Sequence, residues 1–392
     1  MAGKYERKKT PVARKPKKQK AKKGKVILLT LLGLLLALLV LVGGVLAFLW
    51  FKLDMIRYDD EVDYGVYTET VVQQDSAEQE TNGQEMVTQE PEIADEENIV
   101  DISGLEMVEE APEIPDSEIA EDSNVLNILV IGTDERTKDF SDNARSDCMI
   151  LVSIDKQNKT VKLVSLERGI GAPILEGIYA GKYDWLTHIF RYGGAELLRK
   201  TVEHCFKVDV DHYVRFNFTS VRSVVDAIGG IDIKLSAREA AALNGNITST
   251  APSRQRMVEG VNHMDGYYAL HFARLRSIDS DWKRVERQRK VILAAVEAVK
   301  GANLIELNEL ANTVLPMVQT NMTKLEIAEL MLYAPNFLKS SFDQMTIPKH
   351  GTYGGMGLMQ GRGGFAVDYE INNDLLHRFL YEGATSDALL AE

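Results

Sequence analysis

The sequence predicts an α/β protein: a three-layer α-β-α sandwich with a mixed central sheet, preceded by one transmembrane helix and a disordered acidic linker. Two observations support this fold class. From residue 124 onward, short apolar runs of strand length alternate with segments of helical period, as in domains that mix strands and helices. Before residue 124 the charges are segregated by sign, and one long stretch carries none.

The net charge of −13 over 392 residues comes from separate segments. Residues 1–25 hold twelve Lys and Arg and one acid, whereas residues 59–123 hold 23 Asp and Glu and no Lys or Arg. Residues 124–392 are nearly balanced, with 31 basic and 33 acidic side chains. Because the acidity belongs to one segment, the total charge indicates neither an acidic nor a basic partner for the folded part.

The uncharged stretch Val26–Phe51 predicts a membrane-spanning helix. It would be about 39 Å long at ~1.5 Å per residue, and a bilayer core needs roughly 20 such residues. A cleaved signal peptide is the alternative, but the apolar run exceeds a signal core and no small-residue cleavage site follows it. The basic tail 1–25 precedes the span, so the positive-inside rule predicts a single-pass protein of the cell membrane, with a cytoplasmic N-terminus and an extracytoplasmic main domain. The tail lacks the interleaved aromatic residues of a nucleic-acid site, so we expect it to lie on anionic lipid and to bind no nucleic acid.

Three regions are expected after the span. Residues 52–123 are rich in Glu, Asp, Gln, Ser and Thr without a sustained apolar period, which predicts a disordered acidic extracytoplasmic linker. The main folded domain is expected at 124–300. Residues 301–392 are predicted to form a helical and Gly-rich C-terminal extension that packs on the same domain.

Within the sandwich, each element follows from its hydrophobic period and its end signals. Strands are predicted at 126–131, 148–154, 160–166, 212–218, 231–235 and 345–347. Helices are predicted at 192–206, 219–228, 265–273, 282–300, 303–314 and 323–339. Thr219 is the expected N-cap of its helix and Gly229 the expected stop. Residues 351–364 read as a Gly-rich loop.

The first candidate site lies between the first two strands. In NILVIGTDERTKDFSDNARSDCMILVSI, Asp134 follows one apolar run and Asp147 opens the next. Carboxylates from two loop ends at one sheet edge can hold Mg²⁺ (or Mn²⁺), which also binds phosphate oxygens. Ordinary capping and turn chemistry is the alternative, since Asp favours both.

Arginines form the second candidate group. Arg168 stands at a strand exit, and Arg274 and Arg276 form an Arg-x-Arg pair whose fork-shaped donors suit a pyrophosphate. A third set shares the i, i+3, i+4 spacing of one helix face at a predicted helix start, where the helix dipole also favours anions; it comprises Arg284, Arg287 and Gln288. An exposed charged surface is the alternative for each set taken alone.

Other chemistries lack their signatures. The sequence has no Gly-x-Ser-x-Gly elbow, P-loop or His-Glu-x-x-His motif, and its histidines show no ligand spacing. The only two cysteines, Cys148 and Cys205, could pair outside the membrane, but buried free thiols are favoured because a domain of this size needs no covalent cross-link.

The order of these segments resembles the LytR–CpsA–Psr family over about residues 125–300. The resemblance is carried by NILVIGTDER, ARSDCMILVSI, KLVSLERGIG, DHYVRFNF, VVDAIGGIDI, EGVNHMDGYYALHFARLR and RVERQRK. It implies a membrane-anchored, Mg²⁺-dependent phosphotransferase. Such an enzyme moves an anionic glycopolymer, such as teichoic acid or capsular polysaccharide, from a polyprenyl-diphosphate carrier to peptidoglycan.

Residue roles follow from the same resemblance. The metal-site aspartates would be Asp134 and Asp147, and the catalytic arginines would be Arg168, Arg274 and Arg276. Substrate binding would fall to Arg145, Arg284, Arg287 and Gln288.

Two positions depart from the family pattern. Pro-Arg-Asp is here Glu167-Arg168-Gly169, and the lysine of a second box is here Trp185. These changes keep two alternatives open: a polyprenyl-phosphate-binding or attenuator-like regulatory protein with little transferase activity, and a lipid diphosphatase that uses water as acceptor.

Overall fold

The computed structural model describes residues 47–48, 50–58, 100–135, 140, 144–248, 255–276, 278–300, 304–337 and 339–391. Most of the predicted transmembrane segment and the middle of the predicted linker lie outside these residues. Among the described residues, no helix is both long enough and apolar enough to cross a bilayer. The membrane helix and the topology therefore stay predictions.

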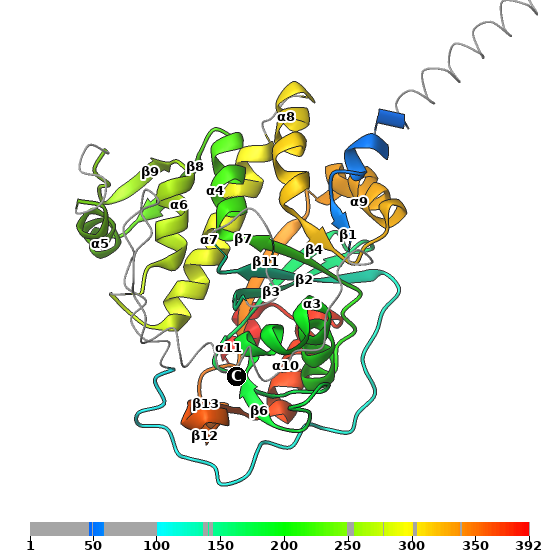
Figure 1. Ribbon diagram of the computed structural model, residues 1–392, viewed down its shortest axis with the longest axis vertical. Helices are drawn as coiled ribbons and strands as arrows, with labels where there is room; N and C mark the ends of the chain where they lie inside the picture. The colour runs from blue at the N-terminus through cyan, green and yellow to red at the C-terminus, as the bar shows by residue number, and fades with distance from the viewer. Residues whose placement is uncertain are drawn as a thin grey trace, which may run out of the picture. The chain divides into compact units, whose positions relative to one another are not determined.

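A mixed sheet runs through the unit formed by Lys52–Glu392 (Figure 1). In the part of the chain that the structure describes, it has seven strands in the order β1-β10-β7-β2-β3-β4-β11. They are β1 (Arg57–Tyr58), β10 (Gln319–Thr320), β7 (His212–Asn217), β2 (Val125–Thr133), β3 (Ser146–Asp155), β4 (Thr160–Leu166) and β11 (Ser341–Ile347). The pairs β10–β7, β2–β3 and β3–β4 are antiparallel, and β1–β10, β2–β7 and β4–β11 are parallel. The predicted mixed central sheet is confirmed.

The two faces of the sheet pack against different helices. In β2, Leu129 and Ile131 belong to the large core shared with α3 (Leu186–Phe206) and α10 (Tyr369–Leu380). Their neighbours Ile128 and Val130 pack instead with residues of α9 (Lys324–Phe337) and α7 (Asp281–Lys300). Successive side chains of a strand point to opposite faces, so the sheet lies between two helical layers.

A second core lies beside the sheet. It is built by α4 (Phe218–Ala227), α5 (Ala237–Thr248), α6 (Gly266–Arg274) and the hairpin of β8 (Ile231–Leu235) and β9 (Gly260–Met264). Val291 of α7 packs into this core, whereas the following residues Ile292 and Leu293 pack against the sheet. The smaller described elements are β5 (Gly171–Pro173), β6 (Tyr183–Trp185), α8 (Leu304–Val314), η2 (Leu315–Met317), η3 (Met359–Gly361) and α11 (Ser386–Ala391).

Residues after 300 are integral to the domain rather than added to it. They supply β10 and β11 to the central sheet and α10 to its helical layer. The expected Gly-rich loop at 351–364 is wrong, because β12 (Tyr353–Gly357) and β13 (Gly363–Val367) form an antiparallel hairpin there. Glycines lower the strand signal in sequence, yet here they leave room for other side chains, because a Cβ on Gly363 would clash with Ile102.

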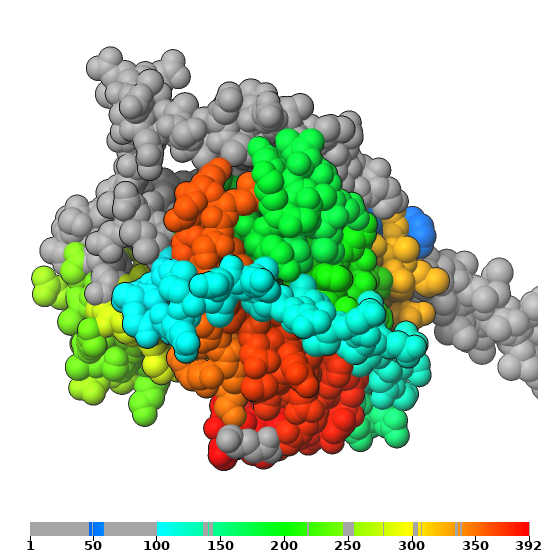
Figure 2. Space-filling view, turned by 90° about the horizontal axis from the view of Figure 1, so that it is seen from below, coloured from blue at the N-terminus to red at the C-terminus, as the bar shows by residue number. Residues whose placement is uncertain are grey.

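The prediction of a disordered linker is wrong for residues 100–123, which we call the strap. Figure 2 shows it lying across one face of the domain. Val100 is buried in the main core, Met107 forms a parallel bridge with Gly355, and Ala120 forms one with Val208. The acidic composition of the strap predicted disorder, but a few of its apolar side chains pack against glycines of the domain.

Two helix starts also differ from the expectation. α3 begins at Leu186, six residues before the predicted start, and continues through a kink at Gly193 and Gly194. α4 begins at Phe218, and its cap is Asn217, whose side chain accepts a hydrogen bond from the backbone N–H of Ser220, rather than the predicted Thr219. Asn is at least as good a cap as Thr, and the observed cap lies two residues before the predicted one.

Candidate functional site

Four chain segments bring charged side chains to one end of the sheet. β4 ends at Leu166 and is followed by Glu167 and Arg168, and β3 begins with Ser146 and Asp147. The connection after α6 carries Arg276, and α7 starts at Asp281. The apolar residues of β3, β4 and α7 pack in a shared core, which fixes these segment ends relative to one another.

Asp281 is the centre of the arrangement. Its Oδ2 accepts hydrogen bonds from Arg168 Nε at 2.8 Å and Arg284 Nη2 at 3.1 Å. Its Oδ1 lies 3.4 Å from Arg276 Nε. Burial would raise the pKa of Asp281, but the three guanidiniums outweigh it and hold the pKa below its usual range. The carboxylate therefore stays ionised and aligns three arginines, two of them almost fully buried.

Asp147 faces the same arginines. Its Oδ2 lies 3.9 Å from Arg276 Nη2, and its Oδ1 is buried without a hydrogen-bond partner among the described residues. Burial opposes ionisation, but Arg284, Arg276, Arg168 and Arg145 lower the pKa of Asp147 nevertheless. An ionised carboxylate with one buried, unpartnered oxygen can accept a further ligand.

Glu167 behaves in the opposite way. Its side chain is fully buried, Oε2 accepts the backbone N–H of Arg168 at 3.0 Å, and Oε1 has no hydrogen-bond partner in the part of the chain that the structure describes. Burial and the nearby Asp281 carboxylate raise the pKa of Glu167 to about 8, against the attraction of Arg284 and Arg168. Of two neighbouring acids, one is thus kept charged and the other neutral at pH 7.

The described side chains of this arginine cluster carry a net positive charge. Among the described residues, and with Glu167 neutral, four guanidiniums (Arg145, Arg168, Arg276 and Arg284) face three carboxylates (Asp134, Asp147 and Asp281). Burial and repulsion from Arg284 and Arg168 lower the pKa of Arg276 to about 10. A bound anion would relieve that repulsion, which is what a phosphate-binding site requires.

A divalent metal fits the residues in part. Within the described residues, no three His, Cys, Asp or Glu side chains are grouped closely enough to hold a metal ion. Asp134 also accepts from Arg145, through Oδ1 to the backbone N–H at 2.8 Å and through Oδ2 to Nε at 2.9 Å. Mg²⁺ commonly takes only one or two carboxylates, with water and substrate phosphates completing its shell. The unpartnered Oδ1 of Asp147 and the buried, unpartnered Oε1 of Gln288 suit that demand.

The predicted residues are not all brought together. Arg168, Arg276 and Arg284 meet at Asp281, while Gln288 donates to the Asp147 carbonyl at 3.4 Å and Arg145 borders the group through Asp134. Arg274 is half-buried at the end of α6.

The expectation that Arg287 projects with Arg284 and Gln288 is wrong. Arg287 Nε donates to Glu239 Oε1 at 3.0 Å, and Nη1 donates to the Leu275 carbonyl at 2.8 Å. Arg287 also pairs with the carboxylate of Asp279. The guanidinium of Arg287 therefore points away from the cluster and stabilises the α6–α7 connection, which carries Arg276.

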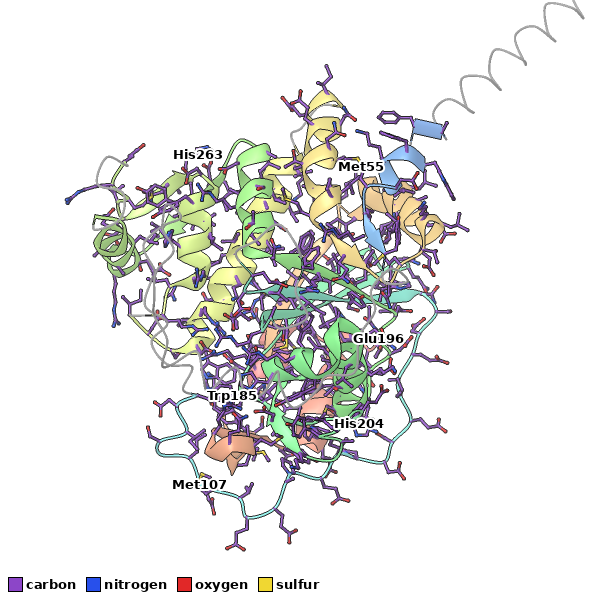
Figure 3. The ribbon with its side chains drawn as sticks, in the orientation of Figure 1. Met55, Met107, Trp185, Glu196, His204 and His263 are labelled. Carbon is purple, nitrogen blue, oxygen red and sulfur yellow. The ribbon has the colours of Figure 1, made fainter. Side chains whose placement is uncertain are left out.

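The two departures from the family pattern have structural explanations. A Cβ on Gly169 would lie 2.6 Å from Val100 Cγ2 and 3.2 Å from Phe365 Cε2, so the strap and the hairpin fill the space beside Arg168. Figure 3 shows Trp185 beside the β12–β13 hairpin, where its indole N–H donates to the Gly363 carbonyl at 2.7 Å. The guanidinium of Arg168 lies over the Trp185 ring, 5.9 Å from its centroid.

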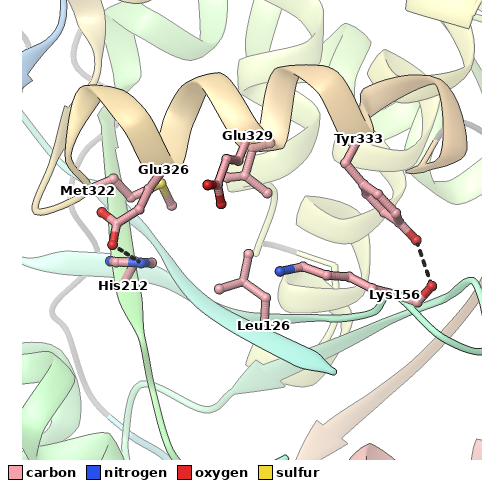
Figure 4. Close-up of a pocket in the computed structure, with 8 residues that line it drawn as sticks. Leu126, Lys156, His212, Met322, Glu326, Glu329 and Tyr333 are labelled. Atoms are coloured by element: carbon pink, nitrogen blue, oxygen red, sulfur yellow. Dashed lines mark hydrogen bonds and ion pairs between the residues drawn. The ribbon is translucent and has the colours of Figure 1, made fainter. Parts of the chain in front are cut away.

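A pocket of about 200 Å³ lies apart from this cluster, between α9 and the strands β2 and β7. His212 and Glu326 lie 3.7 Å apart in it, and Tyr333 donates to the Lys156 carbonyl at 3.4 Å (Figure 4). None of the predicted site residues lines it. It belongs to the α9 face of the sheet, where Met322 and Ile128 share a core.

Sequence reasoning missed the central residue. The predicted helix at 282–300 starts one residue after Asp281, which is not among the predicted site residues. An acid in the first turn of an arginine-rich helix is the signal that points to it as a partner of those arginines. Both cysteines are free thiols, as predicted, and burial raises the pKa of each to about 12.

Comparison with known proteins identifies a matching family and several relatives. The sequence pattern described as the LytR_cpsA_psr family matches residues 71–370. The chain is 29% identical over 234 residues to the polyisoprenyl-teichoic acid–peptidoglycan teichoic acid transferase TagU of Bacillus mycoides, a match that covers 58% of this chain and 70% of that protein. It is 32% identical over 181 residues to the corresponding transferase TagT of Bacillus subtilis, covering 46% of this chain and 54% of that one.

Solved structures share the fold. TagT bound to LI-WTA superposes with a TM-score of 0.54 at 24% identity, covering 68% of this chain and 94% of that one. The protein gbs0355 from Streptococcus agalactiae gives a TM-score of 0.56 at 21% identity, covering 68% of this chain and 91% of that one. At these sequence identities, the similarity shows a shared fold only. The family pattern spans most of the sequence, and on that ground the chain belongs to the LytR_cpsA_psr family.

Proposed function

We propose that this chain is a membrane-anchored phosphotransferase that moves an anionic glycopolymer, of teichoic acid or capsular type, from a polyprenyl diphosphate to peptidoglycan. The observation that carries the proposal is the set of three guanidiniums, from Arg168, Arg276 and Arg284, aligned on the Asp281 carboxylate. The names of the relatives TagU and TagT, both transferases of teichoic acid to peptidoglycan, support the same chemistry.

The arginines bind and stabilise charge. A diphosphate that links a lipid to a sugar carries two negative charges, and the cluster's excess of guanidiniums offers planar, paired donors to its oxygens. Since Arg168 and Arg284 are buried and fixed by Asp281, they need little reorganisation as charge develops on the leaving phosphate. Removing one donor of this kind typically costs about 100- to 1,000-fold in turnover.

The reaction exchanges one phosphorus–oxygen bond for another. A sugar hydroxyl of peptidoglycan attacks the phosphorus nearer the polymer, forming a phosphodiester, while the bond to the lipid-side phosphate breaks and polyprenyl monophosphate leaves. The hydroxyl proton passes to a water molecule held by Asp147. A bound Mg²⁺ (or Mn²⁺) would supply Lewis-acid stabilisation of the phosphate oxygens. Asp147 and Gln288 would hold that ion, with Asp134 held at the border by Arg145.

The proposed location follows from the sequence. One span at 26–51, with a basic tail before it, would leave the domain on the outer side of the cell membrane, where peptidoglycan lies. Protection of the tail, but not of the domain, from protease added to intact cells would support this topology. The reverse pattern would exclude it.

A transfer assay tests the proposed function. The purified full chain is incubated with Mg²⁺, a polyprenyl-diphosphate-linked polymer and peptidoglycan oligomers, and both polyprenyl monophosphate and wall-linked polymer are measured. Arg276→Ala is the test variant because its side chain is 32% exposed and should not disrupt the fold. Arg378→Ala, on α10, is the matched control. Full transfer by Arg276→Ala would refute the proposal.

A second candidate is a protein that binds the lipid diphosphate without transferring the polymer. The observation that favours it is the filled space beside Gly169, where Val100 and Phe365 leave no room for a carboxylate. Stoichiometric lipid binding without release of lipid phosphate, in the presence of Mg²⁺ and acceptor, would establish this function instead. Lipid phosphate released without wall-linked polymer would identify a diphosphatase.

A further inference from the structure

The β12–β13 hairpin is attached to the segments that border the arginine cluster. Trp185 Nε1 donates to the Gly363 carbonyl at 2.7 Å, and the Phe365 N–H donates to the Gly169 carbonyl at 2.8 Å. Ile170 and Phe365 also form a parallel bridge. The start of β13 is therefore held directly beside Arg168, and with it the residue that precedes the strand.

That residue is Arg362. Its guanidinium carbon lies 5.7 Å from the centroid of the Trp185 ring, and that of Arg168 lies 5.9 Å from the same centroid. A guanidinium near an indole face is attracted by the ring quadrupole. Arg168 and Arg362, which are far apart in the sequence, thus both lie near the Trp185 ring.

Arg362 shares its carboxylate partner with several other donors. Its nearest carboxylate is Asp184, with Nη1–Oδ distances of 3.4 and 3.5 Å. Asp184 already accepts the backbone N–H of Trp185 at 2.8 Å and the hydroxyl of Tyr192 at 2.7 Å, and it contacts His188 Nδ1 at 3.2 Å. Arg362 also donates to Gln360 in its own turn, and 24% of its side chain is exposed. A guanidinium has five N–H donors, so Arg362, which is partly exposed and lies near the same indole ring as Arg168, can donate to a further anion.

We propose that Arg362 binds a phosphate oxygen of the substrate next to Arg168, so that the C-terminal hairpin contributes a substrate-binding residue to the site. The inference rests on the proposed function, because it takes the substrate to be a phosphorylated lipid-linked polymer. Phosphate oxygens occur both in the lipid diphosphate and in a phosphodiester of the polymer, and either can be the group that Arg362 contacts.

Binding measurements with two probes test the proposal. Dissociation constants are measured for a short-chain polyprenyl diphosphate without polymer and for the same lipid carrying the polymer. The proteins are the wild type, Arg362→Ala, Arg362→Lys and the control Arg378→Ala, whose ion pair with Asp374 lies within α10. A hydrogen bond to a charged group is worth about 1.5–3 kcal/mol, so Arg362→Ala should weaken binding roughly ten- to hundredfold.

Each outcome has a defined meaning. Weaker binding of both probes by Arg362→Ala, with partial recovery in Arg362→Lys, assigns Arg362 to the diphosphate. Weaker binding of the polymer-bearing probe alone assigns it to the polymer. Unchanged affinity for both probes in a folded Arg362→Ala protein overturns the proposal.

Transfer kinetics separate the two proposals. If the wild type transfers polymer and Arg362→Ala raises KM with little change in kcat, both stand. If the wild type binds but never transfers, while Arg362→Ala still weakens binding, the proposed transfer fails and the assignment of Arg362 survives. If the wild type transfers and Arg362→Ala matches Arg378→Ala throughout, only the assignment of Arg362 fails.

Discussion

Replacing Glu167 with glutamine should make the protein more stable, and increasingly so as the pH rises. Glu167 is fully buried, and its pKa is raised from 4.5 to about 8 by burial and by the Asp281 carboxylate. Between these two pH values the folded protein binds a proton at Glu167 that the unfolded chain does not bind. The free energy of unfolding of the wild type therefore falls as the pH rises through this window.

The magnitude follows from the shift. One pKa unit corresponds to ~1.36 kcal/mol, so the penalty at Glu167 grows by about 3 kcal/mol between roughly pH 5.5 and pH 8. Glutamine has the same shape and can still accept the Arg168 N–H, but it never ionises. The difference in unfolding free energy between Glu167→Gln and the wild type should grow by that amount over the window.

Urea denaturation of both proteins at half-unit pH steps measures this difference. Glu176→Gln is the control, because Glu176 is an exposed residue paired with Lys200 and screened by solvent. The control should stay parallel to the wild type. If the Glu167→Gln curve also runs parallel to the wild type from pH 5.5 to 8, Glu167 is not a neutral buried acid and the division of charge with Asp281 is wrong.

Three further changes have expected outcomes. Gly169→Ala should lower the free energy of unfolding by about 1–3 kcal/mol through overpacking against Val100, and Val100→Ala should largely restore it; additive losses in a denaturation series would contradict this. Asp281→Asn should cost about 3–5 kcal/mol by leaving buried guanidiniums uncompensated, and an unchanged melting midpoint would argue against its central place. Asp147→Asn should raise the Mg²⁺ concentration for half-maximal transfer at least about tenfold, whereas an unaltered Mg²⁺ titration would remove Asp147 from the metal site.

The regular parts of the fold could be predicted because each strand or helix carries its own period. The strands expected at 126–131, 148–154 and 160–166 are the central β2, β3 and β4. The β12–β13 hairpin and the strap could not be predicted, since their burial depends on glycines in one segment meeting apolar side chains in another. Composition averages over a segment and does not register such pairwise fits.

For the candidate site, the spacing of the arginines predicted that they share one face of α7, but it could not predict where their long side chains point. Arg284 and Arg287 are one turn apart on α7, yet Arg284 reaches Asp281 while Arg287 reaches Glu239 and Asp279. An arginine side chain is long enough to turn toward either side of its helix, so the nearest carboxylate decides where it points. Those carboxylates come from segments whose approach the sequence does not reveal.

Helix α7 links the site to the cooperativity of the whole domain. Its first turn carries Asp281, Val291 packs in the core of α4, α5 and α6, and Ile292 and Leu293 pack against the sheet. Neither core can open without moving the helix that aligns the arginines. A ligand that binds only the assembled cluster should therefore protect backbone amides in both cores from hydrogen exchange, including those far from the phosphate.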